Sequence, residues 1–257
     1  MFRLLRIEYS KLKHYNAFWI MNIAYMLMLP ITMWGFSELD IDFWVQGSAF
    51  FDFPNVWEVG AYVASWFNFL LGIVIIIFTC NEFTNKTMRQ NIIDGVSRIG
   101  VFKSKFVLIF AYALGATLYT LIVSFLFGAL YGSGSDYFSK ISVLGLYLIQ
   151  TFGYLTLALM FSFLLRKAGF TVILFIGIIF IEFIARAPMS GELAQYMPIR
   201  TMSKLVPIPY FEKFMIFMSN RGNGFEPISL VTQLMLFIIY LGTFISITFW
   251  NFKKRNA

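Results

Sequence analysis

Six uncharged stretches limit what this sequence of 257 residues can fold into. Five of them contain 20 to 26 residues, and a helix of about 20 apolar residues crosses the roughly 30 Å hydrocarbon core of a bilayer. The remaining stretch has 14 residues before Glu182, or 18 if its helix continues to Ala185. We therefore expect an all-α, polytopic membrane protein with six transmembrane helices. They are predicted at residues 17–36, 61–80, 106–131, 141–165, 168–181 and 227–252.

The composition agrees with a membrane domain and excludes several kinds of site. Charged residues make up 13% of the chain, whereas a soluble domain has about a quarter. One cysteine, Cys80, excludes an intramolecular disulfide, and one histidine, His14, leaves too few ligands for most metal centres. Between the five long stretches, no segment is long enough for a separate domain of typical size. Residues 1–257 are therefore predicted to form a single transmembrane domain that binds no metal or other cofactor itself.

The distribution of Lys and Arg predicts the orientation in the membrane. With the N-terminus in the cytoplasm and six crossings, 14 of the 20 basic residues lie on the cytoplasmic side, together with 3 of the 13 acidic ones. This asymmetry follows the positive-inside rule and predicts that both termini are cytoplasmic. The membrane is expected to be a prokaryotic plasma (inner) membrane. Clustered basic residues can also indicate nucleic-acid binding. Membrane topology already accounts for them, so no nucleic-acid partner is expected.

Residues 1–16 mix apolar and basic side chains ahead of the first predicted span. Leu5, Tyr9 and Leu12 recur near helical spacing among Arg and Lys residues. A helix with one apolar and one cationic side suits the inner membrane interface, where it would contact lipid. We favour such an interfacial elbow helix over the alternative, an ordinary positively charged flank of the first span.

The segment 81–105 is predicted to carry a short cytoplasmic helix. Thr87 and Gln90 fit the capping-box pattern, the run 88–94 follows, and Gly95 stands where helices often end in a left-handed residue. A helix of about two turns is therefore expected here.

This short helix has an apolar side that should be covered. Met88 and Ile92 are four residues apart and share a side, with Ile93 and Val96 nearby. That is a large apolar surface for a bare loop of this size. Either a partner protein or the inner ends of the protein's own helices would cover it, and spacing leaves both alternatives open.

Residues 186–229 contain five of the seven prolines and only short apolar pieces. Pieces of this length can only dip into the membrane or lie on it, so we expect an outer re-entrant hairpin before the last helix. Just before it, Glu182 and Arg186 are four residues apart in the favourable order for a helical ion pair. Charges inside a membrane usually face a bundle interior or a water-filled cavity. The pair is predicted either to be structural or to contact a transported substrate.

Uncharged polar residues within the spans are further candidates for a pathway or a dimer seam. Each one is individually expected to make a hydrogen bond between helices. They are Asn68, Thr79, Thr117, Thr120, Ser124, Gln150, Thr151, Thr156 and Gln233.

These features together resemble the membrane subunits of ABC exporters of the type V fold, that is, ABC transporter permeases. The stretch RIEYSKLK is similar to their opening elbow helix, and residues 197–209 (MPIRTMSKLVPIP) look like the outer segment before their last helix. The most specific match is a coupling-helix pattern of an acid, a polar stretch, T-x-R, G-V-S-R and a basic residue. The residues that match it in order are Glu82, Asn85, Thr87, Arg89, Gly95, Val96, Ser97, Arg98 and Lys103.

The resemblance implies a permease subunit that moves an unidentified substrate, by expectation a lipid-like, peptide or hydrophobic compound that is exported. No G-x-x-x-x-G-K-[ST] motif occurs, so ATP and Mg are expected on a separate ABC ATPase, present in two copies beside two permease chains that form a homo- or heterodimer. The chain itself is not expected to be an enzyme. The implied ATPase-coupling residues are Glu82, Thr87, Met88, Arg89, Ile92, Gly95, Ser97 and Arg98.

Two other classes of function remain as alternatives. An accessory or immunity-type subunit would bind a partner without transport, and the same fold serves either role. An intramembrane enzyme would need acid, base or metal-binding groups clustered within the spans. Glu182 stands nearly alone there and His14 lies outside the spans, so the enzyme is the less favoured alternative.

Overall fold

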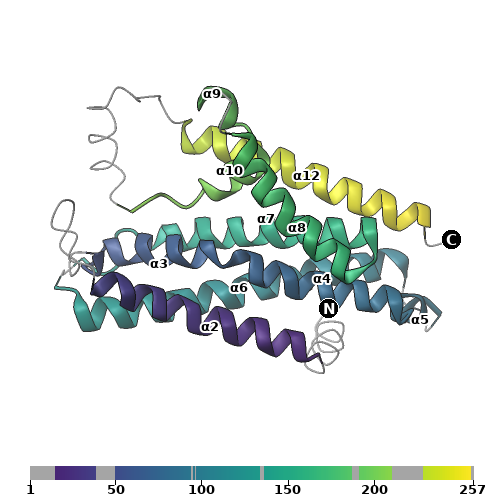
Figure 1. The fold of residues 1–257 in the computed structure, drawn as a ribbon, viewed down its shortest axis with the longest axis horizontal. Coiled ribbons are helices and arrows are strands. Elements are labelled where there is room, and N and C mark those ends of the chain that lie inside the picture. Colours follow the sequence, from purple (N-terminus) through teal and green to yellow (C-terminus); the bar gives the residue numbers. More distant parts are fainter. Residues whose placement is uncertain are drawn as a thin grey trace.

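A computed structural model describes residues 15–38, 50–93, 95, 97–133, 136–186, 191–209 and 228–255, and the regular elements among them are all helices. The predicted all-α fold class is therefore confirmed for this part of the chain. Figure 1 labels the helices. They are α2 (Asn16–Ser37), α3 (Asn55–Trp66), α4 (Asn68–Thr84), α5 (Thr87–Ile93), α6 (Arg98–Tyr131), α7 (Ser142–Leu165), α8 (Ala168–Ala185), α9 (Gly191–Ala194), α10 (Pro198–Ser203) and α12 (Leu230–Arg255).

Five of these helices, namely α2, α6, α7, α8 and α12, are long and apolar enough to cross a membrane. The pair α3 and α4 adds a sixth span if the two are taken together. These helices are those of a multi-pass membrane protein, as the uncharged stretches predicted. The shortest predicted span, at 168–181, is 18 residues long in the structure, because α8 continues past Glu182 to Ala185.

The second span was predicted as a single helix over 61–80, and the structure differs from this prediction. It begins earlier, at Asn55, and is broken at Phe67, where the axes of α3 and α4 differ by 43°. Ser65 donates its hydroxyl proton to the carbonyl of Tyr62, and the Asn68 side chain is held by α7. Polar side chains that bond locally or to another helix compete with continuous helix geometry, which explains the break.

Helix α7 is the centre of the fold. It contacts α3, α4, α6, α8, α10 and α12. In its most apolar stretch of 18 residues, 67% of the residues are buried. The corresponding share is only 6% in α12, which packs mainly on α7 and α10. Helix α12 therefore lies at the edge of the described structure, with most of its apolar surface facing outward.

Small residues bring α7 close to α12. A Cβ atom added to Gly153 of α7 would lie 2.5 Å from the ring of Phe237, which is buried against this glycine. Small residues at such contacts let helices approach closely in a membrane. The ring of Phe237 therefore lets α12 pack closely on α7 at this glycine.

The helices run up and down between two ends of the molecule, which we call the α5 end and the α10 end (Figure 1). Helix α5, the turn between α7 and α8, and the last residues of α12 lie toward the α5 end. Helices α9 and α10 and the start of α12 lie toward the α10 end.

Two predicted segments are described only in part. Of the elbow helix at 1–16 only the last two residues are described. Of the hairpin at 186–229 the structure describes Arg186 and residues 191–209 and 228–229. Within 191–209 it contains two short helices and then a non-helical stretch in which Leu205 and Val206 are buried.

Candidate functional site

The predicted cytoplasmic helix exists as α5 and ends where expected. Residues on either side of it adopt left-handed backbone conformations, Lys86 with φ 55° and Gly95 with φ 90°. Glycine adopts this conformation without steric cost, which explains the helix end. The capping-box prediction is wrong: Thr87 is the first helical residue and donates to the carbonyl of Glu82, while the amide of Gln90 donates to the carbonyl of Lys86.

The G-V-S-R part of the motif joins α5 to α6. The hydroxyl of Ser97 accepts a hydrogen bond from the amide of Gly100 at 3.1 Å and so caps the first turn of α6. Arg98 is the first residue of that helix and is exposed. Gly95 and Ser97 are thus explained by the turn between the two helices, while Arg98 faces outward.

Glu82 forms a buried ion pair with Lys105 that ties α4 to α6. Both side chains are almost completely inaccessible, and the ammonium group of Lys105 also lies 4.6 Å from the centre of the Phe78 ring. Glu82 is therefore not accessible for direct contact with a partner protein, and its implied part in ATPase coupling stays a prediction. The opposite charges of Glu82 and Lys105 at the two ends of one predicted segment are a sequence signal for this pair, but the pair was not predicted.

Two apolar residues of α5 pack against the protein's own helices. Met88 is 4% exposed and belongs to the cluster that contains Phe102 of α6 and Phe252 of α12, and Ile92 is partly buried against the same cluster. The protein's own helices therefore cover Met88, which corrects its implied docking on a partner, and they cover Ile92 only in part. Ile93, in contrast, is 69% exposed.

The exposed residues around α5 define the surface that remains for a partner. Arg89 and Ile93 lie one turn apart on α5, and Arg98 and Ile99 begin α6 beyond the Gly95 turn. We call these four residues the α5 face. It combines two cations with two exposed isoleucines at one end of the molecule.

The second candidate site begins at Glu182 and Arg186, near the α10 end. Their predicted ion pair is confirmed, with 3.2 Å between the carboxylate and the guanidinium. The carboxylate also accepts hydrogen bonds from the backbone amides of Ile199 at 2.9 Å and Arg200 at 2.7 Å. These amides belong to the first turn of α10, where free N–H groups and the helix dipole favour a negative charge. Glu182 therefore anchors α10 to α8, which supports the structural alternative for this carboxylate.

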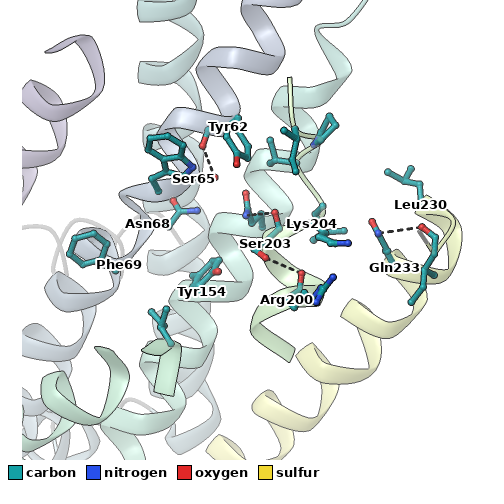
Figure 2. A pocket seen from close by; sticks show the side chains of 18 of the residues that line it. Tyr62, Ser65, Asn68, Phe69, Tyr154, Arg200, Ser203, Lys204, Leu230 and Gln233 are labelled. Atoms are coloured by element: carbon teal, nitrogen blue, oxygen red, sulfur yellow. Dashed lines mark hydrogen bonds between the residues drawn. The ribbon is translucent and has the colours of Figure 1, made fainter. Parts of the chain in front are cut away.

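A cavity of about 770 Å³ lies beside this anchor. Figure 2 shows its lining: Tyr62, Ser65, Asn68 and Phe69 on one side, Arg200, Ser203 and Lys204 opposite them, and Leu230 and Gln233 from α12. Aromatic and aliphatic side chains supply much of the wall. The break at Phe67 contributes to the cavity, because residues from both sides of it belong to the lining.

Three cations line this cavity, namely Arg186, Arg200 and Lys204. Burial lowers the pKa of Lys204, and the nearby charges of Arg200 and Arg186 lower it further. Burial likewise lowers the pKa of Arg200, in spite of Glu182. No acidic side chain is among the described residues of the lining, and Glu182 behind it already serves Arg186 and α10.

Two buried amides lack a partner on the side of the cavity. Asn68 accepts hydrogen bonds from Tyr147 at 3.2 Å and Thr151 at 3.1 Å, yet its own NH₂ group has no hydrogen-bond partner. Gln150 donates to the carbonyl of Ser203 at 3.4 Å, and its side-chain oxygen has no partner. Both side chains are 1% exposed and line the cavity.

Asn68 is also the end of a polar chain through the bundle. The hydroxyl of Tyr147 in α7 lies 2.7 Å from that of Tyr25 in α2, which in turn lies 3.2 Å from the hydroxyl of Thr120 in α6. The predicted role of Asn68, Thr120 and Thr151 in hydrogen bonds between helices is thus confirmed.

The remaining polar candidates divide into three kinds. The hydroxyls of Thr117 and Thr156 donate to carbonyls one turn back in their own helices. Thr79 and Ser124 are buried with hydroxyls that lack a hydrogen-bond partner. Gln233 joins the cavity lining from α12. Among the described residues, no group of three or more His, Cys, Asp or Glu side chains is placed to hold a metal ion.

A family model described as "Protein of unknown function (DUF2705)" matches residues 17–257. The chain belongs to this family. The match covers all six predicted spans, so the DUF2705 region includes both the α5 face and the cavity. The search of curated proteins gave no match.

In this DUF2705 chain, the sequence predicted a role for Arg186 but not for the other two cations of the cavity, Arg200 and Lys204. Arg200 and Lys204 lie in the segment 197–209, which the resemblance marked without assigning either residue a role. Their spacing of four residues is a signal, since it places both on one side of a helical turn. Their approach to Asn68 depends on how α10 folds back onto α8, which no local pattern reveals.

Proposed function

We propose that this protein is the permease subunit of an ATP-binding-cassette transporter, and that a separate ATPase docks on the α5 face. The observation that carries the proposal is how α5 is held against the long helices. The short helix α5, at one end of the molecule, packs against long helices through Met88 and Ile92. It exposes Arg89 and Ile93, and the first residues of α6, Arg98 and Ile99, are exposed as well. The resemblance of this segment to coupling helices supports the same role.

These contacts of α5 with its neighbours would transmit a displacement of α5 to the membrane helices. The buried pair of Glu82 and Lys105 connects α4 with α6 next to α5, and Met88 adds apolar contacts. Breaking a buried ion pair is costly, so α5 and the ends of α4 and α6 should move together.

The same helix that begins beside the cavity ends beside α5. Asn68 is the first residue of α4, Glu82 lies near its other end, and the break at Phe67 separates α4 from α3. A rotation of α4 about this break would change the cavity while α3 keeps its place. A hinge of this kind is an ordinary element of transport and switching motions.

A pull-down experiment tests the docking. The tagged wild-type protein and an Arg89→Glu, Arg98→Glu variant are purified from membranes of the native cells. The eluates are then searched by mass spectrometry for a soluble protein with a G-x-x-x-x-G-K-[ST] motif and assayed for ATP hydrolysis. We expect the wild type to recover this ATPase and the variant to lose most of it, because the charge reversal repels a complementary surface.

The control is a Lys253→Glu, Lys254→Glu variant, which makes the same change of charge on exposed residues at the same end of the molecule. It should recover the ATPase as the wild type does. Equal recovery by the wild type and by the Arg89, Arg98 variant would refute docking at the α5 face.

A further inference from the structure

The cavity beside α10 has the size and position of a ligand site. Its volume of about 770 Å³ lies within the range of small-molecule pockets, roughly 300 to 1,000 Å³. It is bounded by the break between α3 and α4, by α7, α8 and α10, and by the start of α12 (Figure 2). Trp66 and Leu230 line it and are also exposed on the outer surface, so its apolar wall continues to the side of the molecule.

Two buried carboxamide side chains of the lining each have one polar atom left over. The oxygen of Asn68 accepts from Tyr147 and Thr151, while its NH₂ group has no hydrogen-bond partner among the described residues. The NH₂ group of Gln150 donates to the carbonyl of Ser203, and its side-chain oxygen likewise has no partner in the described part of the chain. A buried polar atom without a partner is costly. A ligand that bonds this donor and this acceptor would remove that cost.

The two amides meet within one turn of α7. Thr151, which holds Asn68, directly follows Gln150 in the chain, and Ser203 faces Asn68 across the cavity (Figure 2). A backbone carbonyl can only accept, so the bond to Ser203 fixes the NH₂ end of Gln150 and leaves its oxygen as the free end. A free donor beside a free acceptor matches a ligand group that carries both a carbonyl and an N–H. A carboxamide is such a group.

The rest of the lining suits a hydrocarbon chain. Trp66 and Phe69 lie on either side of the break between α3 and α4, and Ile179 of α8 and Leu230 of α12 belong to the same cavity. Contact with an apolar chain removes the surface of these side chains from water. The exposed edges of Trp66 and Leu230 mark where the chain would leave the cavity.

The three cations of the lining do not require a charged ligand. Arg186 is paired with Glu182 at 3.2 Å, and Arg200 and Lys204 also have interactions with other groups of the chain. An uncharged head group that bonds Asn68 and Gln150 leaves all of these contacts in place.

We propose that the cavity binds an uncharged amphiphile through a carboxamide head group. Its carbonyl accepts from the NH₂ group of Asn68, and its N–H donates to the side-chain oxygen of Gln150. Its hydrocarbon chain lies along Trp66, Phe69 and Ile179. This inference goes beyond the proposed function, because binding in the cavity does not require an ATPase on the α5 face. Either proposal can therefore fail while the other stands.

Matched ligands test the recognition of the amide. Tritium-labelled N-methyloleamide is titrated onto the detergent-purified protein, and unlabelled N,N-dimethyloleamide, octadecene and a capped dileucine peptide compete with it. N,N-dimethyloleamide keeps the carbonyl and the chain but lacks the N–H, so it should bind about tenfold more weakly, as expected for one lost hydrogen bond. Octadecene lacks the head group and the peptide lacks the chain, so both should also bind more weakly than N-methyloleamide. Equal affinity of the two amides, or stronger binding of the peptide, would overturn the proposal.

A Gln150→Met variant locates the bound N–H in the cavity. Methionine fills nearly the same space without the oxygen, so N-methyloleamide should bind about tenfold more weakly and no better than N,N-dimethyloleamide. Gln195→Met is the matched control, because Gln195 also has a buried side-chain oxygen without a described partner and lies outside the lining. This control should bind both amides as the wild type does. If Gln150→Met keeps the preference for N-methyloleamide, the ligand does not contact this residue.

Thermal unfolding without ligand separates the binding site from the fold. The bond from Gln150 to Ser203 is long at 3.4 Å, and the oxygen of Gln150 makes no bond to a described residue. Gln150→Met should therefore leave the Tm of the unliganded protein unchanged or raise it slightly. A clearly lower Tm would show that this oxygen already serves the fold and would overturn its assignment to a ligand.

Discussion

Glu82 and Lys105 are each a charged residue at the end of an apolar helix, and neither is accessible. Two charges placed this deeply are stabilised because they face each other, and the ammonium group also lies beside an aromatic ring. The pairing of Glu82 with Lys105 was not predicted, since a local motif cannot reveal a contact with a residue 23 positions away. For Glu182 and Arg186 the pairing was predicted correctly, because a spacing of four residues in one helix is local information.

Removing one member of the Glu82 and Lys105 pair should destabilise the protein strongly. We expect Glu82→Gln or Lys105→Met alone to cost about 3–5 kcal/mol, since the remaining charge stays buried after the opposite charge of the ion pair has been removed. The double variant should recover much of this loss, because no buried charge remains. Thermal unfolding of the detergent-purified proteins measures all three.

The comparison for this pair is the more exposed ion pair of Lys140 and Glu58, with 3.0 Å between its charged atoms. Lys140→Met should cost less than about 1 kcal/mol, as is usual for exposed pairs. If the losses of the two single variants at Glu82 and Lys105 simply add in the double variant, the two charges are not coupled as the structure indicates.

At the scale of elements, the helices themselves were predicted well and their interruptions were not. The uncharged stretches located α2, α6, α7, α8 and α12, because the length needed to cross a membrane is a strong constraint. The break at Phe67 was missed, since no proline or glycine marks it and it depends on how α7 holds Asn68. The short helix α10 was not predicted either, because its first turn is stabilised by Glu182 from α8.

The turn between α5 and α6 should tolerate substitution of Gly95 poorly. A φ of 90° is a conformation that residues with a Cβ rarely adopt, and nothing within 4 Å of this glycine would otherwise resist a methyl group. We expect Gly95→Ala to destabilise the turn by about 1 kcal/mol or more and to reduce ATPase recovery in the pull-down.

Gly115, in the interior of α6, provides the matched control, because a Cβ there also meets nothing within 4 Å but the backbone is helical. Gly115→Ala should leave the Tm unchanged or raise it slightly, since alanine favours helices. A Tm of Gly95→Ala equal to that of Gly115→Ala would contradict the role of the left-handed residue.

For the whole molecule, the sequence predicted the number of spans and an orientation, and the structure describes how the spans pack. Central α7 is no more apolar in sequence than peripheral α12, so their different burial could not be predicted. Burial in a membrane bundle depends on which helix faces pack against one another. Apolar residues cover lipid-facing and protein-facing helix surfaces alike, so apolar composition does not tell the two apart. The cavity was hidden for the same reason, because its lining comes from six helices and the segments beside them.

Labelling of single cysteines tests the predicted orientation. Ser139 lies in the exposed link between α6 and α7, and Lys254 lies near the end of α12 on the opposite side of the molecule. A membrane-impermeant maleimide should label Ser139→Cys in intact cells and Lys254→Cys only after permeabilisation. Native Cys80 is buried and should remain unlabelled in intact cells. The reverse pattern would place the α5 end outside, where a cytoplasmic ATPase could not reach it.

The length of α4 sets how a displacement at one end compares with one at the other. Its 17 residues span about 25 Å, and a rod of this length that pivots by about 5° at one end moves by about 2 Å at the other. The pivot would lie at Asn68, whose two accepted hydrogen bonds hold α4 to α7. A displacement of about 2 Å at Thr84 would therefore appear at the cavity as a rotation of α4 by a few degrees about the side chain of Asn68.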